Sequence, residues 1–121
     1  MEELVGRVVA AAGIERTVAE RAIGIILEFL ATEGPPDHVA NLVARLPGAA
    51  ETIEATRAGA GAESFGMGGI MGVGSRLMSV GLGMSEIQGV AHELISYARE
   101  KVGGEDVDAI VAAIPGLGQF I

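Results

Sequence analysis

The sequence predicts an all-α domain built from two similar units, and three observations carry this prediction. Half of the 121 residues are apolar, which suits one compact domain with a single core. Apolar residues recur at helical spacing along most of the chain. Sliding the chain by 68 positions aligns residues 5–53 with residues 73–121 without a gap, at nine identities in 49 positions. We therefore expect an internally duplicated six-helix domain, whose two three-helix units are related by a pseudo-twofold axis.

The repeat divides this single domain, residues 1–121, into three parts. Unit 1 covers about residues 1–53, unit 2 covers about residues 69–121, and a glycine-rich connector of about residues 54–68 joins them. Nine of the 19 glycines fall within residues 59–83. Gly6 and Gly74 occupy equivalent positions, so we expect the first helices of the two units to cross closely there, where no side chain intervenes.

Each unit is expected to start with a helix that ends at a glycine, Gly13 or Gly81, as helices commonly do. A middle helix follows, with Thr17 or Ser85 as its predicted N-cap and Glu20 or Gln88 three residues further on. The expected buried stripes are Val18, Ala22, Ile25, Ile26 and Phe29 in unit 1, and Ile87, Val90, Ala91, Leu94, Ile95 and Ala98 in unit 2. Phe29 and the equivalent Tyr97 are both expected in the core, whereas Gly24 and Glu28 are expected to face outward.

A short third helix completes each unit. Gly34-Pro35-Pro36 and Gly103-Gly104 interrupt the chain, and acidic residues then suit the positive end of a new helix. Pro47 and Pro115 are expected to end these helices. Their apolar faces are Val39, Leu42, Val43 and Leu46 in one unit and Val107, Ile110, Val111 and Ile114 in the other. Helices of about ten residues need tertiary packing to persist, so each unit should pack against the other.

The third helices also carry a resemblance to a known family. Each ends in a Leu-Pro or Ile-Pro-Gly turn, within DVDAIVAAIPGLGQF at residues 106–120 and VANLVARLP at residues 39–47. This pattern, preceded by two longer helices, resembles small bacterial helical domains of unknown function, including the VcgC/VcgE-type family. The resemblance implies a bacterial origin and an α-helical fold, and it carries over no catalytic residues.

Composition argues against several classes of function. The sequence contains eight Lys and Arg residues and 16 Asp and Glu residues, and the resulting net charge of -8 disfavours nucleic-acid binding. The absence of cysteine excludes disulfides and thiolate metal sites. The weakly charged stretch of residues 64–85 contains Arg76 and many glycines, so we expect no stable membrane insertion. The acidic start, Met1-Glu2-Glu3, is unlike a secretory signal, and a cytoplasmic location is expected.

Motifs for chemistry are incomplete. The glycines of residues 69–76 have P-loop spacing, but Ser75 stands where the loop needs Lys. His92-Glu93 begins an HExxH pattern that Ser96 breaks, and the other histidine, His38, lies in the other unit. No serine lies in a GxSxG setting. We therefore expect a non-enzymatic protein without cofactor or metal, and we keep a metal-assisted enzyme using His92 and Glu93 as a third hypothesis.

A methionine-rich face is the best functional lead, because methionine side chains adapt to varied apolar partners. Its predicted partner-binding residues are Phe65, Met67, Ile70, Met71, Leu77 and Met78. The face predicts protein association, either as a homo-oligomer or with another protein. The alternative is a carrier or sensor of a small apolar or lipid-like ligand, held between the units and lined by the same methionines. The competing structural interpretation is that the face belongs to the core.

Overall fold

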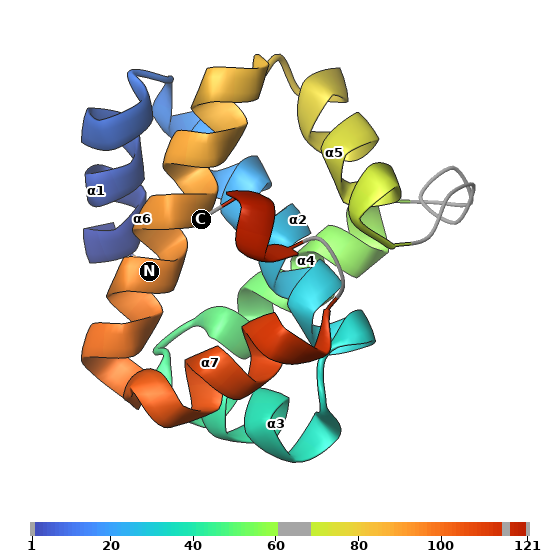
Figure 1. Cartoon of the computed structure of the whole chain (residues 1–121). Helices are drawn as coiled ribbons and strands as arrows, with labels where there is room; N and C mark the ends of the chain where they lie inside the picture. Colours follow the sequence, from blue (N-terminus) through green and yellow to red (C-terminus); the bar gives the residue numbers. More distant parts are fainter. Residues whose placement is uncertain (1, 61–68, 115–116, 121) are drawn as a thin grey trace.

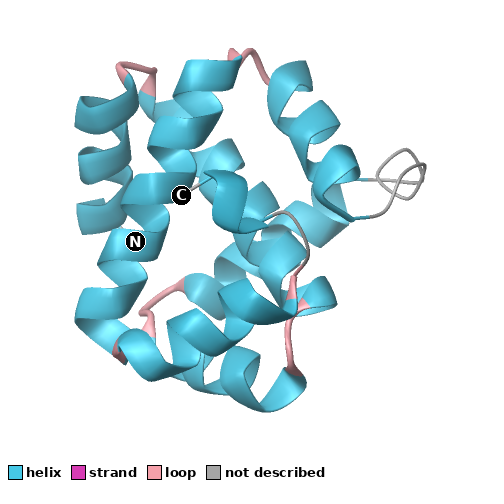
Figure 2. Cartoon of the chain, in the orientation of Figure 1, coloured by secondary structure: helices cyan, strands magenta, loops and turns pink. Residues whose placement is uncertain are grey.

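The computed structural model describes residues 2–60, 69–114 and 117–120, and within these ranges it contains helices and no strand (Figures 1 and 2). The described chain forms seven α-helices and one short 3-10 helix. They are α1 (Glu2–Ala12), α2 (Arg16–Glu33), α3 (Pro36–Arg45), α4 (Ala49–Ala60), α5 (Gly69–Ser79), α6 (Met84–Val102), α7 (Gly104–Ala113) and η2 (Leu117–Phe120). The prediction of an all-α fold is confirmed for this part of the chain.

The sequence predicts six helices, whereas the described residues form seven α-helices, and the additional one is α4. It runs through the end of the predicted unit 1 and into the predicted connector, residues 54–68. Its inner face consists largely of small residues: Ala49 and Ile53 are buried, and Thr52 and Thr56 are half-buried beside them. Because small and polar residues contribute little to hydrophobic periodicity, the sequence pattern of residues 54–63 is typical of a linker or of a frayed helix end.

Helix α2 lies at the centre of the molecule. Six consecutive residues, 22–27, are buried, so α2 is covered on every side in its middle. Gly24, expected to face outward, is among them because α4 covers that face. A Cβ atom at Gly24 would overlap the Thr56 hydroxyl, which instead donates a hydrogen bond of 2.9 Å to the Thr52 carbonyl oxygen. The missing side chain at Gly24 therefore lets α4 approach α2 closely.

The first and fifth helices each pack against a long helix from the other part of the sequence. In Figure 1, α1 lies along α6, and contacts between residues also join α5 to α2. Arg7 of α1 forms ion pairs with Glu93 and Glu100 of α6, at 2.9 and 2.7 Å. Arg76 of α5 forms an ion pair of 3.3 Å with Glu28 of α2. Polar groups thus border both helix pairs.

The predicted close crossing at Gly6 and Gly74 is wrong. A Cβ atom on either glycine would meet no described atom within 4 Å, and Gly6 is exposed. The reason is that α1 packs on α6 and α5 packs on α2, with the glycines away from these contacts. The close approach that glycine permits occurs instead at Gly24.

The predicted N-caps at Thr17 and Ser85 are also wrong, because both helices begin earlier. Helix α2 has Glu15 as its N-cap, and the earlier start lets Arg16 pair with Glu20 at 3.2 Å, one turn along the helix. Helix α6 has Gly83 as its N-cap. Its free backbone N–H donates to the Glu86 carboxylate at 2.7 Å, so a side chain of the first turn supplies the cap.

The apolar faces of the third helices are confirmed. Helices α3 and α7 pack against each other, as Figure 1 also shows. Their buried residues are Val39, Leu42 and Leu46 on one side and Val107, Ile110 and Ile114 on the other. Phe29 and Tyr97 are buried as expected, with 5% and 4% of their surface exposed. The core is therefore continuous across α2, α3, α6 and α7.

Gly34, between α2 and α3, provides a test of this packing. A Cβ atom there would lie 2.6 Å from the Leu30 carbonyl oxygen and 2.8 Å from Val39 Cγ2. We expect Gly34→Ala to lower the free energy of unfolding by about 1–3 kcal/mol, because backbone and a packed side chain must shift. Urea denaturation followed by circular dichroism measures this change.

Gly6→Ala is the matched control. Its Cβ atom meets open space on a helix, so we expect an increase of up to about 1 kcal/mol from the higher helix propensity of alanine. Equal stability of the two variants would contradict the packing described at Gly34.

Candidate functional site

The turn between α5 and α6 directly follows Leu77 and Met78, the last two residues of the predicted partner-binding face. Helix α5 ends in a Schellman motif: the Gly81 N–H donates to the Met78 carbonyl at 3.0 Å, and the Leu82 N–H donates to the Leu77 carbonyl at 3.3 Å. Gly81 has a φ of 104°, which glycine adopts without strain. The motif directs Leu77 and Leu82 into the core, where both are buried.

Two methionines flank this turn on its outer side. Met78 is 51% exposed and Met84 is 52% exposed, and in the described part of the chain they are the large hydrophobic residues that are exposed. Met78 lies in the last turn of α5, and Met84 is the first residue of α6. We call the surface formed by Met78 and Met84 the α5–α6 corner.

The predicted partner-binding residues do not form one surface in the described part of the chain. Phe65 and Met67 lie outside the described residues. Ile70 and Met71 belong to α5, but their side chains are outside the description as well. Leu77 is buried in the core with 2% of its surface exposed, and Met78 is exposed. Within the described part, the predicted face is therefore divided between core and surface.

Sequence reasoning did not place Met84 in the site. The signal was present, since Met84 belongs to the same group of methionines and follows the glycines of the turn. It was missed because helical spacing from Met67 to Met78 defines one helix face, whereas Met84 starts the next helix. Helical spacing within one helix therefore cannot predict that both residues flank the same turn.

The charged groups near the corner already have partners. Arg76 pairs with Glu28, and the two side chains are only 20% and 14% exposed. Glu86 caps the start of α6 through the Gly83 N–H. Arg76 therefore does not act as a free cation for an anionic ligand at this turn.

The histidines and carboxylates considered for a metal site are separated. His38 lies in α3, where its Nδ1 atom is 2.7 Å from the Asp106 carboxylate. Glu93 of the HExxH-like segment is held by Arg7, and His92 beside it is exposed. Among the residues that the structure describes, no three His, Cys, Asp or Glu side chains gather closely enough to hold a metal ion.

Polar contacts connect α3 with α6 and α7 on the outer side of the core. Asp106 of α7 accepts hydrogen bonds from His38 at 2.7 Å and from the Asn41 amide at 3.4 Å. Arg45 of α3 donates to the carbonyl of Val102, the last residue of α6, at 3.2 Å. Hydrogen bonds from His38 and then Asn41 lower the pKa of the Asp106 carboxyl, because they stabilise its charged form.

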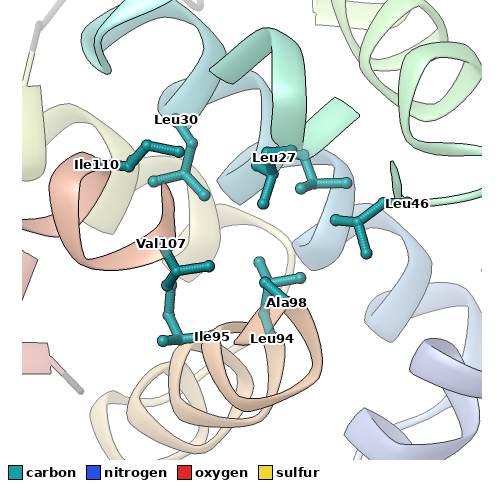
Figure 3. Close-up of a pocket in the computed structure, with 9 residues that line it drawn as sticks. Leu27, Leu30, Leu46, Leu94, Ile95, Ala98, Val107 and Ile110 are labelled. Carbon is teal, nitrogen blue, oxygen red and sulfur yellow. The ribbon is translucent and has the colours of Figure 1, made fainter. Parts of the chain in front are cut away.

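Beneath these contacts lies a small chamber between α2, α3, α6 and α7 (Figure 3). Nine aliphatic side chains line it: Leu27, Leu30, Leu42, Leu46, Leu94, Ile95, Ala98, Val107 and Ile110. All nine are at most 6% exposed. Its free volume is about 10 Å³, and none of its lining residues is a methionine. A chamber of this size is far smaller than a lipid chain requires.

The chain matches no family model, no curated protein and no solved structure. The resemblance to the VcgC/VcgE-type family therefore stays a prediction. No helix in the described ranges combines the length and apolar character that crossing a bilayer requires.

The contacts of Asp106 predict a pH dependence of stability. The pKa of the Asp106 carboxyl is lower in the folded state than in the unfolded chain, where it is about 3.9. The ionised carboxylate therefore stabilises the fold fully above the unfolded pKa. This stabilisation is lost as the pH falls through the folded pKa. We expect Asp106→Asn to be less stable than the wild type at pH 7, with a difference that shrinks at pH 3. Urea denaturation at both pH values measures it.

Asp37→Asn provides the control, since Asp37 is an exposed carboxylate in the first turn of α3. A stability difference for Asp106→Asn that stays the same from pH 7 to pH 3 would contradict the role assigned to the carboxylate.

Proposed function

We propose that this protein is a non-enzymatic association module that binds a second copy of itself through the α5–α6 corner. The single observation that supports this most directly is the exposure of Met78 and Met84 on one turn, at 51% and 52%. Large apolar side chains that lie together on a surface are typical of interaction sites. Methionine is flexible and polarizable, so it packs well against varied apolar surfaces.

A second copy is the favoured partner because the corner can complement itself. In a twofold dimer, Met78 of one copy can contact Met84 of the other, and the reverse contact follows by symmetry. The corner consists otherwise of small or polar exposed residues, Ser79, Gly81, Gly83 and Ser85, which allow close approach. A surface of this extent supports a weak, concentration-dependent dimer rather than an obligate one.

We also infer that the fold arose by duplication, with the two units related by a pseudo-twofold axis. Supporting this, α3 and α7 begin and end 68 residues apart, and their C-caps have similar angles, φ -100°, ψ 107° at Leu46 and φ -104°, ψ 109° at Ile114. His38 and Asp106, which the same shift aligns, contact each other. The shift also aligns α1 with α5 and α2 with α6. Each first helix packs on the middle helix of the other unit, α1 on α6 and α5 on α2.

The alternative function is a carrier of an apolar ligand held between the units. The sequence suggests methionines as the lining of its binding site, whereas the chamber between α2, α3, α6 and α7 is lined by aliphatic side chains. Its volume of about 10 Å³ is too small for a lipid-like ligand. Self-association therefore remains the better supported function.

Charge placed at the corner tests the proposal. We expect the double variant Met78→Glu with Met84→Glu to weaken self-association at least about tenfold, because a carboxylate in an apolar interface loses its hydration. Light scattering over a hundredfold range of protein concentration measures the dissociation constant, and circular dichroism shows whether the variant is folded.

A control with the same charge change replaces two exposed alanines elsewhere, Ala40→Glu with Ala50→Glu. This variant should associate nearly as the wild type does. A wild type that stays monomeric across the whole range, or equal weakening in both double variants, would refute association through the corner.

Salt should strengthen the proposed dimer. Each copy carries a net charge of -8, so two copies repel each other, and added salt screens this repulsion. We expect the dissociation constant to fall between 20 mM and 500 mM NaCl. Association that weakens with salt would indicate an interface built from ion pairs, in conflict with the methionine contact.

A further inference from the structure

The α5–α6 corner carries two methionines that the equivalent turn of unit 1 lacks. The 68-residue shift aligns Met78 with Ala10 and Met84 with Arg16, and both of these residues are exposed beside the turn between α1 and α2. Each turn contains a glycine with a positive φ, and Arg16 forms an ion pair with Glu20. A turn of this kind therefore forms without methionine, so the fold does not require the two exposed thioethers.

Methionine supplies all the sulfur of this chain, because the sequence has five methionines and no cysteine. Oxidation of sulfur by peroxide therefore acts on methionine thioethers. In the part of the chain that the structure describes, no methionine belongs to the core, and Met78 and Met84 are each about half exposed. Sulfoxides at the corner, which lies at the outer edge of the molecule in Figure 1, change the surface and leave the described core intact.

The charge of the protein indicates the kind of oxidant that reaches the corner. A net charge of -8 repels anionic oxidants, whereas it does not affect the approach of neutral ones. Arg76 is paired with Glu28 and does not offset this repulsion as a free cation. A small neutral hydroperoxide, such as hydrogen peroxide, therefore suits this surface.

We propose that the α5–α6 corner is an oxidation site, at which a small neutral hydroperoxide converts Met78 and Met84 to sulfoxides and so separates the two copies of the protein. With hydrogen peroxide, the thioether sulfur attacks one oxygen, the O–O bond breaks and an S–O bond forms. The sulfur gives up two electrons, and the leaving hydroxide takes the proton of the transferred oxygen and becomes water. The inference rests on the proposed self-association and specifies its regulation.

The sulfoxide weakens association because it makes an apolar contact polar. Its oxygen is a hydrogen-bond acceptor that water satisfies in the free copy, whereas a contact between methionines offers it no donor. Peroxide reaches both thioethers because a weak dimer continually releases free copies, in which Met78 and Met84 are exposed. Oxidised copies therefore accumulate as monomers.

Light scattering on the full chain, before and after treatment with hydrogen peroxide, tests the inference. We expect the dissociation constant of the wild type to rise at least about tenfold, with an unchanged helical circular dichroism signal. Peptide mapping by mass spectrometry should find one added oxygen on Met78 and one on Met84.

The outcomes separate this inference from the proposed function. Association that is unchanged when both methionines are oxidised overturns the oxidation site alone, and so does a loss of association that accompanies unfolding. Corner methionines that stay unoxidised also overturn it. A wild type that is monomeric before treatment refutes self-association, and the oxidation site falls with it.

Met78→Leu with Met84→Leu is the matched variant, because leucine is apolar and cannot be oxidised, while the remaining methionines stay in place. Its readout is the ratio of the dissociation constants after and before peroxide, which should be close to one. A ratio as large as that of the wild type would assign the effect to other methionines and overturn the inference.

Met78→Gln with Met84→Gln decides the question if the leucine variant does not associate measurably. Glutamine has the polarity and about the length of the sulfoxide side chain, so this variant should associate at least about tenfold more weakly than the wild type without peroxide. The control is Ala40→Gln with Ala50→Gln, at exposed positions, which should associate as the wild type does. Equal association of the two glutamine variants would overturn the inference.

Discussion

The burial of the middle of α2 on all sides is the constraint on which the other packing depends. Six consecutive buried residues, 22–27, leave its middle no face for solvent, so several helices must cover it. Contacts join α2 to α1, α4, α5 and α6, and Gly24 removes the side chain that would keep α4 at a distance. A helix that is apolar nearly all round is stable only in such an environment.

Polar groups secure this arrangement from its edges. Arg7 lies between Glu93 and Glu100 and also 5.4 Å from the centre of the Tyr97 ring, so one side chain joins α1 to α6 by charge and by a cation–π contact. The ion pair between Arg76 and Glu28 joins α5 to α2. No polar or charged residue is buried in the described part of the chain. Specific charge contacts thus fix the positions of the helices, while the apolar core supplies most of the stability.

Sequence reasoning recovered the elements that rest on strong periodicity and missed those that rest on small residues. The faces of α2, α3, α6 and α7 were predictable because Leu, Ile and Val recur at helical spacing. Helix α4 was not, since Ala49 and Thr56 give little hydrophobic signal and Gly24, its packing partner, resembled a surface residue. At the candidate site, Met78 was predictable as a member of a helix face, but Met84 comes to the same corner only through the turn.

The corner and the chamber share α6 but not its residues, and this separates their effects. Met84 begins the helix, whereas Leu94, the first chamber residue on α6, lies ten residues later, about 15 Å along the axis. The chamber faces inward among aliphatic side chains, and the corner faces solvent. A charge at Met84 therefore has no direct contact through which to alter the chamber. A substitution at the corner and a substitution at the chamber therefore act at separate places in the fold.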